Sequence, residues 1–334
     1  MHLALDAMGG DFAPQAVIQG VLQAIPDTPT DIHYILVGDE NAIKSELGTD
    51  NNDRISILPT TQIITMDEPG SRVIKTKPDS SIVKGLKLVK DGKADAFISA
   101  GNTGAVMSTS LFGLGRIQGV RRPALGAYIP TLMGGKILCD VGANPDAKPY
   151  HMLQFAIMAS HYLSHVEKIK NPPIGLVNIG SESNKGSELY QKTYKLLKQE
   201  LDNFIGNVEG RHLLDCEAKV LVCDGFVGNT VLKFAEAWVK TFSAEIRNKI
   251  GNHPRYTLGG LLLKPVFSKL KKQFDYEEYG GAPLLGVKGV SIICHGSSTG
   301  KAIKNSILVA KTCVEKNLIE DTKVSLAEHL GVQI

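Results

Sequence analysis

The sequence has few cysteines, and they do not form a pattern typical of a disulfide framework or a zinc site. Five cysteines, an odd number, occur among the 334 residues, and none belongs to a CxxC pair. The chain also lacks the run of about 18 apolar residues that a membrane-spanning helix requires. No signal-peptide pattern precedes the first acidic residue, Asp6. We therefore expect a soluble protein of the reducing cytosol.

Strong charge and several standard catalytic motifs are missing as well. The net charge is +3, which is too small to predict a nucleic-acid partner. Neither HExxH nor GxSxG occurs, and the GSSTGKA segment at 296–302 is one residue short of a phosphate-binding P-loop. The cysteines mostly lie in apolar runs. We therefore expect no covalent nucleophile, no cofactor and no metal.

Glycine, with 34 residues, gathers in a unit that occurs seven times: a short apolar run, a glycine-containing polar loop, and an amphipathic run. This alternation predicts an α/β fold of three layers, with a mainly parallel sheet and helices on both faces. The seven polar loops should meet at one sheet edge, where such folds bind ligands. The apolar runs are HLAL, YILV, AFIS, KILC, GLVN, VLVC and SIIC, and the expected helices are 14–24, 81–90, 103–114, 150–166, 187–201, 229–246 and 299–314.

The loop SAGNTGA predicts an anion site at Gly101, Asn102, Thr103 and Gly104. Free N–H groups at a helix start attract anions, and glycine allows a ligand to approach the backbone. The alternative is a simple helix-start turn in which Thr103 is the N-cap.

The loop DAMGGD places Asp6, Gly9 and Gly10 directly after the first run. Its carboxylates can orient a substrate. Equally, Asp11 can cap the helix that follows, because aspartate is a preferred N-cap residue.

Three further loops each carry a polar candidate. Lys185 in NIGSESNKGS can hold phosphate as a point charge, with Glu182 as its partner, or can be an ordinary solvated lysine. Asn229 in DGFVGN can donate a hydrogen bond to an oxyanion or cap the helix that it begins. His295, with Ser297 in HGSS, can act as a general base or belong to a capping turn.

Residues 251–283 interrupt the repeating pattern with an amphipathic helical segment. Its apolar positions include Leu258, Leu262, Val266 and Leu270, and Pro265 should kink or divide the helix. The intervening lysines are Lys264, Lys269, Lys271 and Lys272. Such a basic stretch can lie in a membrane interface, or it can pack in the core of a dimer. We expect one catalytic domain over 1–334 with a helical insertion at about 240–283.

The ordered set DAMGGD, SAGNTGA, DVGAN, DAKP, NIGSE, NKG, DGFVGN, YGGAPLLG and HGSS closely resembles the bacterial phosphate acyltransferase family of fatty acid and phospholipid synthesis. The resemblance covers essentially the whole chain. It implies a fold like that of phosphotransacetylases and isopropylmalate dehydrogenase, with a helical protrusion. It carries the key lysine and asparagine of the family onto Lys185 and Asn229. The family more often has Val at Pro145 and Thr at Val227, which leaves a hydroxyl role at 227 in doubt.

The resemblance also implies a reaction, in which acyl-[acyl-carrier protein] and inorganic phosphate give acyl phosphate and free carrier protein. It implies a homodimer that touches the inner face of the cell membrane through the protrusion. The glycerol-3-phosphate acyltransferase of the next step is a candidate partner. The competing hypotheses are a phosphotransacetylase-like enzyme that uses acyl-CoA, and a non-catalytic scaffold that binds the membrane and the carrier protein.

Overall fold

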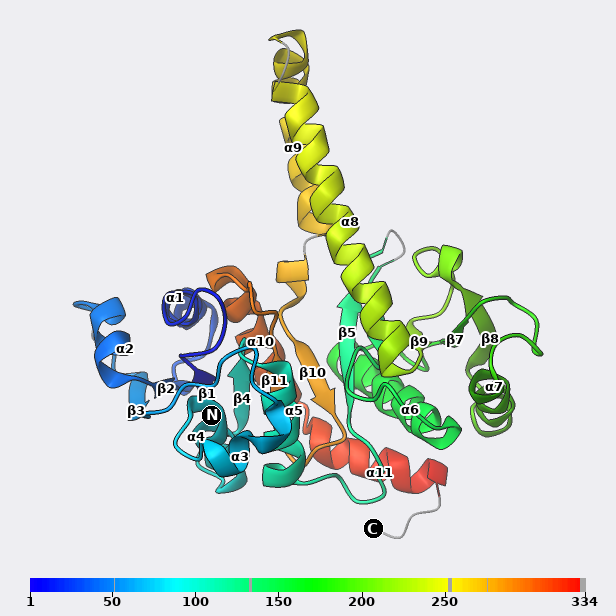
Figure 1. Cartoon of the computed structure of the whole chain (residues 1–334), viewed down its shortest axis with the longest axis horizontal. Helices are drawn as coiled ribbons and strands as arrows, with labels where there is room; N and C mark the ends of the chain where they lie inside the picture. Colours follow the sequence, from blue (N-terminus) through cyan, green and yellow to red (C-terminus); the bar gives the residue numbers. More distant parts are fainter. Residues whose placement is uncertain (51, 132–133, 252–253, 275, 331–334) are drawn as a thin grey trace.

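The computed structural model describes residues 1–50, 52–131, 134–251, 254–274 and 276–330, which form one large sheet with helices on both faces (Figure 1). In sheet order the strands are β3 (Ile55–Pro59), β2 (His33–Gly38), β1 (His2–Asp6), β4 (Ala96–Ser99), β11 (Val290–Ile293), β10 (Ala282–Leu285), β5 (Ala124–Ile129), β6 (Lys136–Cys139), β9 (Val220–Val222), β7 (Ile174–Asn178) and β8 (Phe204–Glu209). The α-helices are α1 (Gln15–Ala24), α2 (Glu40–Leu47), α3 (Val73–Thr76), α4 (Ser81–Lys90), α5 (Thr103–Thr109), α6 (Pro149–Val166), α7 (Glu188–Glu200), α8 (Gly225–Gly251), α9 (Pro254–Phe274), α10 (Gly300–Glu315) and α11 (Leu318–Leu330).

The seven apolar runs predicted as strands all form strands, namely β1, β2, β4, β6, β7, β9 and β11. Their side chains are mostly buried on both sides, as in β4 and β9, which explains why the runs are almost wholly apolar. Strands β3, β5, β8 and β10 were not predicted. None of them belongs to a strand–glycine loop–helix unit, and β8 is only partly buried.

The sheet consists of two parallel wings that run in opposite directions. Strands β3, β2, β1, β4 and β11 pair in parallel, and so do β6, β9, β7 and β8. Three successive antiparallel pairings, β11–β10, β10–β5 and β5–β6, lie between the wings. The expectation that all seven polar loops meet at one edge is therefore wrong, because the carboxyl ends of the two wings point in opposite directions.

Two apolar cores, one on each face of the sheet, confirm the three-layer architecture. One core receives side chains from α1, α6, α7, α10 and α11, including Ile18, Phe155 and Ile307. The other receives side chains from α3, α4 and α5, including Leu86 and Val106. Because the central strands face a core on both sides, the polar loops at their ends are the parts of the sheet open to a ligand.

Helices α8 and α9 pair to form a protrusion that stands out from the body (Figure 1). The prediction that Pro265 could divide this segment is wrong, since α9 continues through that residue. The longest helix, α8, begins within the polar loop after β9, so the protrusion and that loop share one helix. Among the described residues, no helix combines the length and the apolar character needed to cross a membrane.

Candidate active site

The loops that follow β1, β4 and β11 pack against one another and form what we call the first wall, residues 6–11, 99–104 and 295–298. The fit is close at Gly9, where a Cβ atom would lie 2.6 Å from the Gly101 nitrogen. The Asp11 N–H donates to the Gly296 carbonyl at 2.7 Å, and Gly10 has a φ of +101°, which favours glycine. The sequence candidates Asp6, Gly9, Gly10, Gly101, Asn102, Thr103, Gly104, His295 and Ser297 therefore lie on this wall.

Asp6 is a structural centre of the first wall rather than an exposed ligand. Its side chain is buried, with Oδ2 accepting from the Ser99 hydroxyl at 2.6 Å and Oδ1 from the Met8 N–H at 3.1 Å. Burial raises the pKa of this carboxyl group. The alternative in which Asp11 caps the next helix is also wrong, because the N-cap position of α1 is Pro14.

The turn at Gly101–Gly104 is partly occupied by the protein itself. Asn102, not Thr103, caps α5, and its Oδ1 accepts from the Ala105 N–H at 2.9 Å. The Asn102 amide group donates to three carbonyls of the 65–68 loop, and the Gly101 N–H donates to Ser99 Oγ. Thr103 and Gly104 remain exposed at the start of the helix, so they are the part of this turn that a ligand can reach.

His295 joins the first wall to helix α8. Its Nδ1 accepts from the Ser297 N–H at 3.2 Å and lies 2.7 Å from Ser297 Oγ. Since Nδ1 accepts, the ring hydrogen of the neutral form is on Nε2, which lies 3.8 Å from Oε2 of Glu236. Glu236 belongs to none of the glycine loops, since it lies two to three turns beyond the DGFVGN loop, and it was therefore not predicted from the sequence.

The loops after β6, β9 and β7 form the second wall, residues 140–144, 178–187 and 224–229. Its structural centre is Asp140, which is fully buried. Oδ1 accepts from the N–H groups of Leu125 and Ala143, and Oδ2 accepts from the backbone and side-chain nitrogens of Asn144 at 2.6 and 3.0 Å. Burial raises the pKa of Asp140. Asp140, the first residue of the DVGAN motif, was not predicted as a site residue. A lone aspartate directly after an apolar run, as at Asp6, was the signal that could have identified it.

Asn229 does not begin its helix, so the alternative in which it caps that helix is wrong. Helix α8 starts four residues earlier because Asp224 Oδ1 accepts from the Val227 N–H at 2.9 Å, as an N-cap does. Gly228 then fits directly against the Asp140 carbonyl, where a Cβ atom would lie only 1.9 Å away. Asn229 is exposed beside Gly142, and its side-chain amide makes no hydrogen bond within the described part of the chain.

Lys185 lies in the loop after β7, on the same wall as Asn229. Its Nζ lies 3.6 Å from Oε1 of Glu182, which confirms the predicted pairing, and its side chain is 46% exposed. Asn178 holds the loop by donating to the Lys185 carbonyl at 3.1 Å. No contact between described residues joins Lys185 to Gly101–Gly104, so the structure places these two candidates on different walls.

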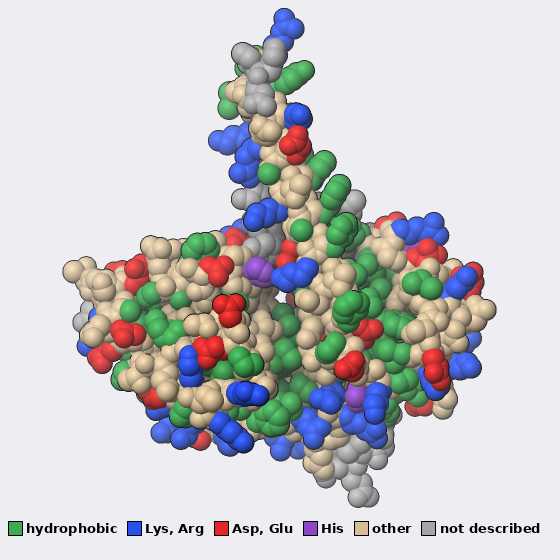
Figure 2. Space-filling model, in the orientation of Figure 1, with side chains coloured by type: hydrophobic (Ala, Val, Ile, Leu, Met, Phe, Trp, Pro, Cys, Tyr) green, Lys and Arg blue, Asp and Glu red, His purple; other side chains and the backbone are tan. Residues whose placement is uncertain are grey.

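A polar stripe on α8 connects the walls. Asn229, Lys233 and Glu236 are spaced i, i+4 and i+7, and therefore lie on one face of the helix. Lys233 pairs with Glu236 at 2.8 Å, and Glu236 reaches His295 on the first wall. Figure 2 shows the body as two lobes with a hollow between them at the base of the protrusion. The stripe therefore joins the two walls, and we call the hollow beside the base of α8 the cleft.

The groups that the two walls expose are suited to binding and polarising an anionic or carbonyl substrate. They are exposed backbone at Thr103 and Gly104, the Asn229 amide and the Lys185 ammonium group. The nearby thiol of Cys294 is buried, and burial raises its pKa to about 12, so it is not a thiolate at neutral pH. The arrangement therefore favours catalysis by positioning and charge stabilisation.

Comparison with solved structures defines the class of fold. A phosphotransacetylase from Streptococcus pyogenes matches with a TM-score of 0.63 and 14% identity, over 94% of each chain. A branched-chain phosphotransacylase from Enterococcus faecalis matches with a TM-score of 0.60 and 12% identity, over 93% of this chain and 99% of the other. The fold is that of the phosphotransacetylases, as predicted.

Comparison of sequences defines the family. Residues 1–321 match the family described as "Fatty acid synthesis protein". A phosphate acyltransferase of Desulfitobacterium hafniense is 50% identical over all of both chains, and one of Heliobacterium modesticaldum is 47% identical over 99% of this chain and 98% of the relative. The chain belongs to this family of fatty acid synthesis proteins, as the ordered motifs indicated, and it is an acyltransferase.

Proposed function

We propose that the protein transfers a fatty acyl group from acyl-[acyl-carrier protein] to inorganic phosphate and releases acyl phosphate for phospholipid synthesis. The observation that carries the proposal is the polar stripe of α8, which links a wall of exposed backbone to a wall that bears an amide and an ammonium group. The relatives that share half of the sequence are phosphate acyltransferases, which supports phosphate as the acceptor.

The reaction needs two partners to meet in the cleft. In our proposal, phosphate binds at Thr103 and Gly104, and its charge is neutralised by Lys185 from the opposite wall. A phosphate oxygen attacks the thioester carbonyl carbon and forms the new C–O bond. The carbonyl oxygen becomes an oxyanion, to which the free Asn229 amide donates a hydrogen bond. The C–S bond then breaks, and the carrier sulfur leaves as a thiolate with the bonding electrons.

The distances within α8 suit this arrangement. Asn229 and Glu236 are seven residues apart, which corresponds to about 10 Å along a helix. Glu236 contacts His295, so Asn229 lies about that far from the first wall along the stripe. That separation leaves room for a phosphate and a thioester between the walls.

The test is an acyl-phosphate assay with the purified full chain, in which hydroxylamine traps the product. We expect phosphate-dependent product from acyl-[acyl-carrier protein] and much less from acyl-CoA. Faster turnover of acyl-CoA would instead favour the phosphotransacetylase-like alternative. Absence of product from both donors would favour the scaffold alternative.

We also propose that the protrusion brings the enzyme to the cytoplasmic face of the membrane. On α9, the side chains of Leu258, Leu262, Val266 and Leu270 are between 44% and 75% exposed. Residues 240–272 contain eight basic residues and one acidic residue, Glu245. An apolar helix surface with a strong positive charge is typical of contact with anionic lipid.

A vesicle experiment separates membrane contact from dimer packing of the same surface. Leu262→Glu with Val266→Glu should release the protein from phosphatidylglycerol vesicles while the turnover of acyl-[acyl-carrier protein] in solution continues. Unchanged vesicle binding would reject the membrane proposal. If the same variant instead converted a dimer to a monomer, the apolar surface would be assigned to the homodimer.

A further inference from the structure

Two histidines and an aspartate come together where α6 and α11 pack against each other, away from the cleft (Figure 1). His161 and His165 are spaced i, i+4 on α6, so they lie on one face of that helix. Asp321 faces them from α11. One potential ligand atom from each of the three side chains lies within 4.8 Å of the other two.

The geometry around His165 is that of a metal-binding histidine, in which one ring nitrogen donates to a carbonyl and the other is available to the ion. Its Nδ1 lies 3.2 Å from the His161 carbonyl oxygen, which directs the ring hydrogen to Nδ1 and leaves the Nε2 lone pair free. Nε2 lies 3.2 Å from Oδ2 of Asp321. Two ligands of a tetrahedral ion with bonds of about 2.0 Å are separated by about 3.3 Å, which matches this spacing.

His161 supplies the second, independent observation. Its Nε2 is buried and has no hydrogen-bond partner among the described residues. Buried polar atoms nearly always have a hydrogen-bond partner, so the unpartnered Nε2 indicates a site where a ligand can bind.

We propose that His161, His165 and Asp321 bind one Zn²⁺ ion, with water in the fourth position, and that the ion ties α11 to α6. Two imidazoles and a carboxylate are a ligand set that zinc prefers. His161 lies 12 residues beyond Pro149, about 18 Å along α6 from the end that follows the second wall, so the ion would be structural.

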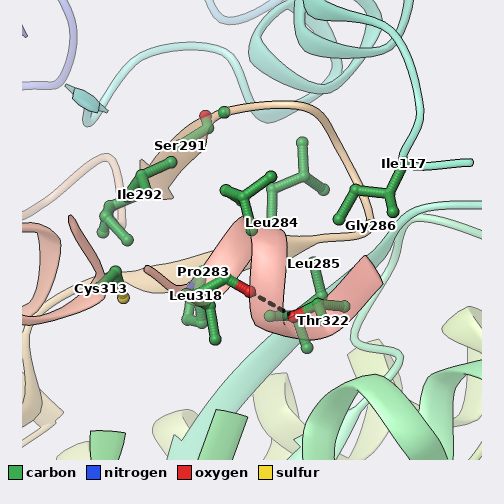
Figure 3. A pocket seen from close by; sticks show the side chains of 13 residues that line it. Ile117, Pro283, Leu284, Leu285, Gly286, Ser291, Ile292, Cys313, Leu318 and Thr322 are labelled. Carbon is green, nitrogen blue, oxygen red and sulfur yellow. Dashed lines mark hydrogen bonds between the residues drawn. The ribbon is translucent and has the colours of Figure 1, made fainter. Parts of the chain in front are cut away.

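The contact between α11 and the sheet shows why such a tie would matter. Leu318 and Thr322 face β10 and β11 across a small cavity of about 10 Å³, and the Thr322 hydroxyl donates to the Leu318 carbonyl (Figure 3). That cavity has room for about one water molecule. The contact between α11 and the sheet is therefore imperfectly packed. An ion on the side of α11 that faces α6 would hold the helix in place.

The test is a Zn²⁺ titration of the chelator-treated full chain, followed by calorimetry and thermal unfolding. We expect one ion per chain and a higher Tm with zinc. His165→Gln and Asp321→Asn are half-exposed positions that should leave the fold intact, and each should weaken zinc binding by roughly a hundredfold. His212→Gln is the matched control, because His212 pairs with Asp215 at 3.1 Å on the surface without a second histidine.

A second readout is the visible spectrum of the Co²⁺-substituted protein. The absorption of a tetrahedral Co²⁺ centre should appear in the wild type and in His212→Gln, and should be lost in His165→Gln. The proposal is overturned if the wild type binds zinc no more tightly than His165→Gln and Asp321→Asn, or if the control loses as much affinity as they do.

Discussion

The two walls of the cleft are built on the same plan and expose different groups. In each, a buried aspartate follows a strand and holds a glycine turn, Asp6 in the first wall and Asp140 in the second. The first wall presents backbone at Thr103 and Gly104, whereas the second presents the side chains of Asn229 and Lys185. The buried aspartate and glycine turn that the walls share therefore have a structural role, whereas the groups that each wall exposes determine how it can act on a substrate.

The largest expected effect is the loss of turnover when the polar side chains of the second wall are removed. Lys185→Ala should lower kcat by roughly 10³-fold and Asn229→Ala by roughly 10²–10³-fold, because charge neutralisation and oxyanion stabilisation act in the transition state. Thr103→Ala keeps the backbone of the first wall and should cost less than about tenfold. Steady-state kinetics in acyl-[acyl-carrier protein] and phosphate measures all three. Near-normal activity of Lys185→Ala would remove that residue from the mechanism.

The second prediction separates the two buried aspartates by stability. Asp140 accepts on Oδ1 from two backbone N–H groups and on Oδ2 from a third, and backbone donors cannot reverse. The NH₂ of Asp140→Asn must therefore face a donor in either orientation, and we expect a loss of about 3 kcal/mol. Asp6 accepts from the Ser99 hydroxyl, which can rotate and accept instead. Asp6→Asn should therefore cost only about 1 kcal/mol. Equal losses in urea unfolding would contradict this difference.

The third prediction concerns pH. Burial raises the folded-state pKa of Asp6, so its contribution to stability is complete below the unfolded pKa and is lost as pH rises through the folded pKa. An asparagine does not titrate. The stability deficit of Asp6→Asn relative to wild type should therefore shrink as pH rises from about 4, the unfolded-state pKa of an aspartate, through the raised folded-state pKa. Thr103→Ala, which removes no charge, should keep a constant difference from wild type over that range.

The sequence predicted the elements better than it predicted their arrangement. The apolar runs identified seven strands because buried parallel strands are apolar on both faces, as in β4. The reversal between the wings depends on β5 and β10, which lack the glycine loop that marked the others. The motif identified Asn229 as a candidate but did not predict its position in the second turn of α8. That position depends on capping by Asp224, which is visible only in the folded loop.

The smallest expected effect concerns the bridge between the walls, His295 and Glu236. Their side chains are 40% and 24% exposed, and the two atoms are 3.8 Å apart, so water and salt screen the pair. A double-mutant cycle with His295→Gln and Glu236→Gln should give a coupling energy of about 0.5 kcal/mol that decreases in 1 M salt. A coupling above about 2 kcal/mol that resists salt would mean that the cleft is closed to water at this point. The two walls would then behave as one rigid unit rather than as two surfaces joined through α8.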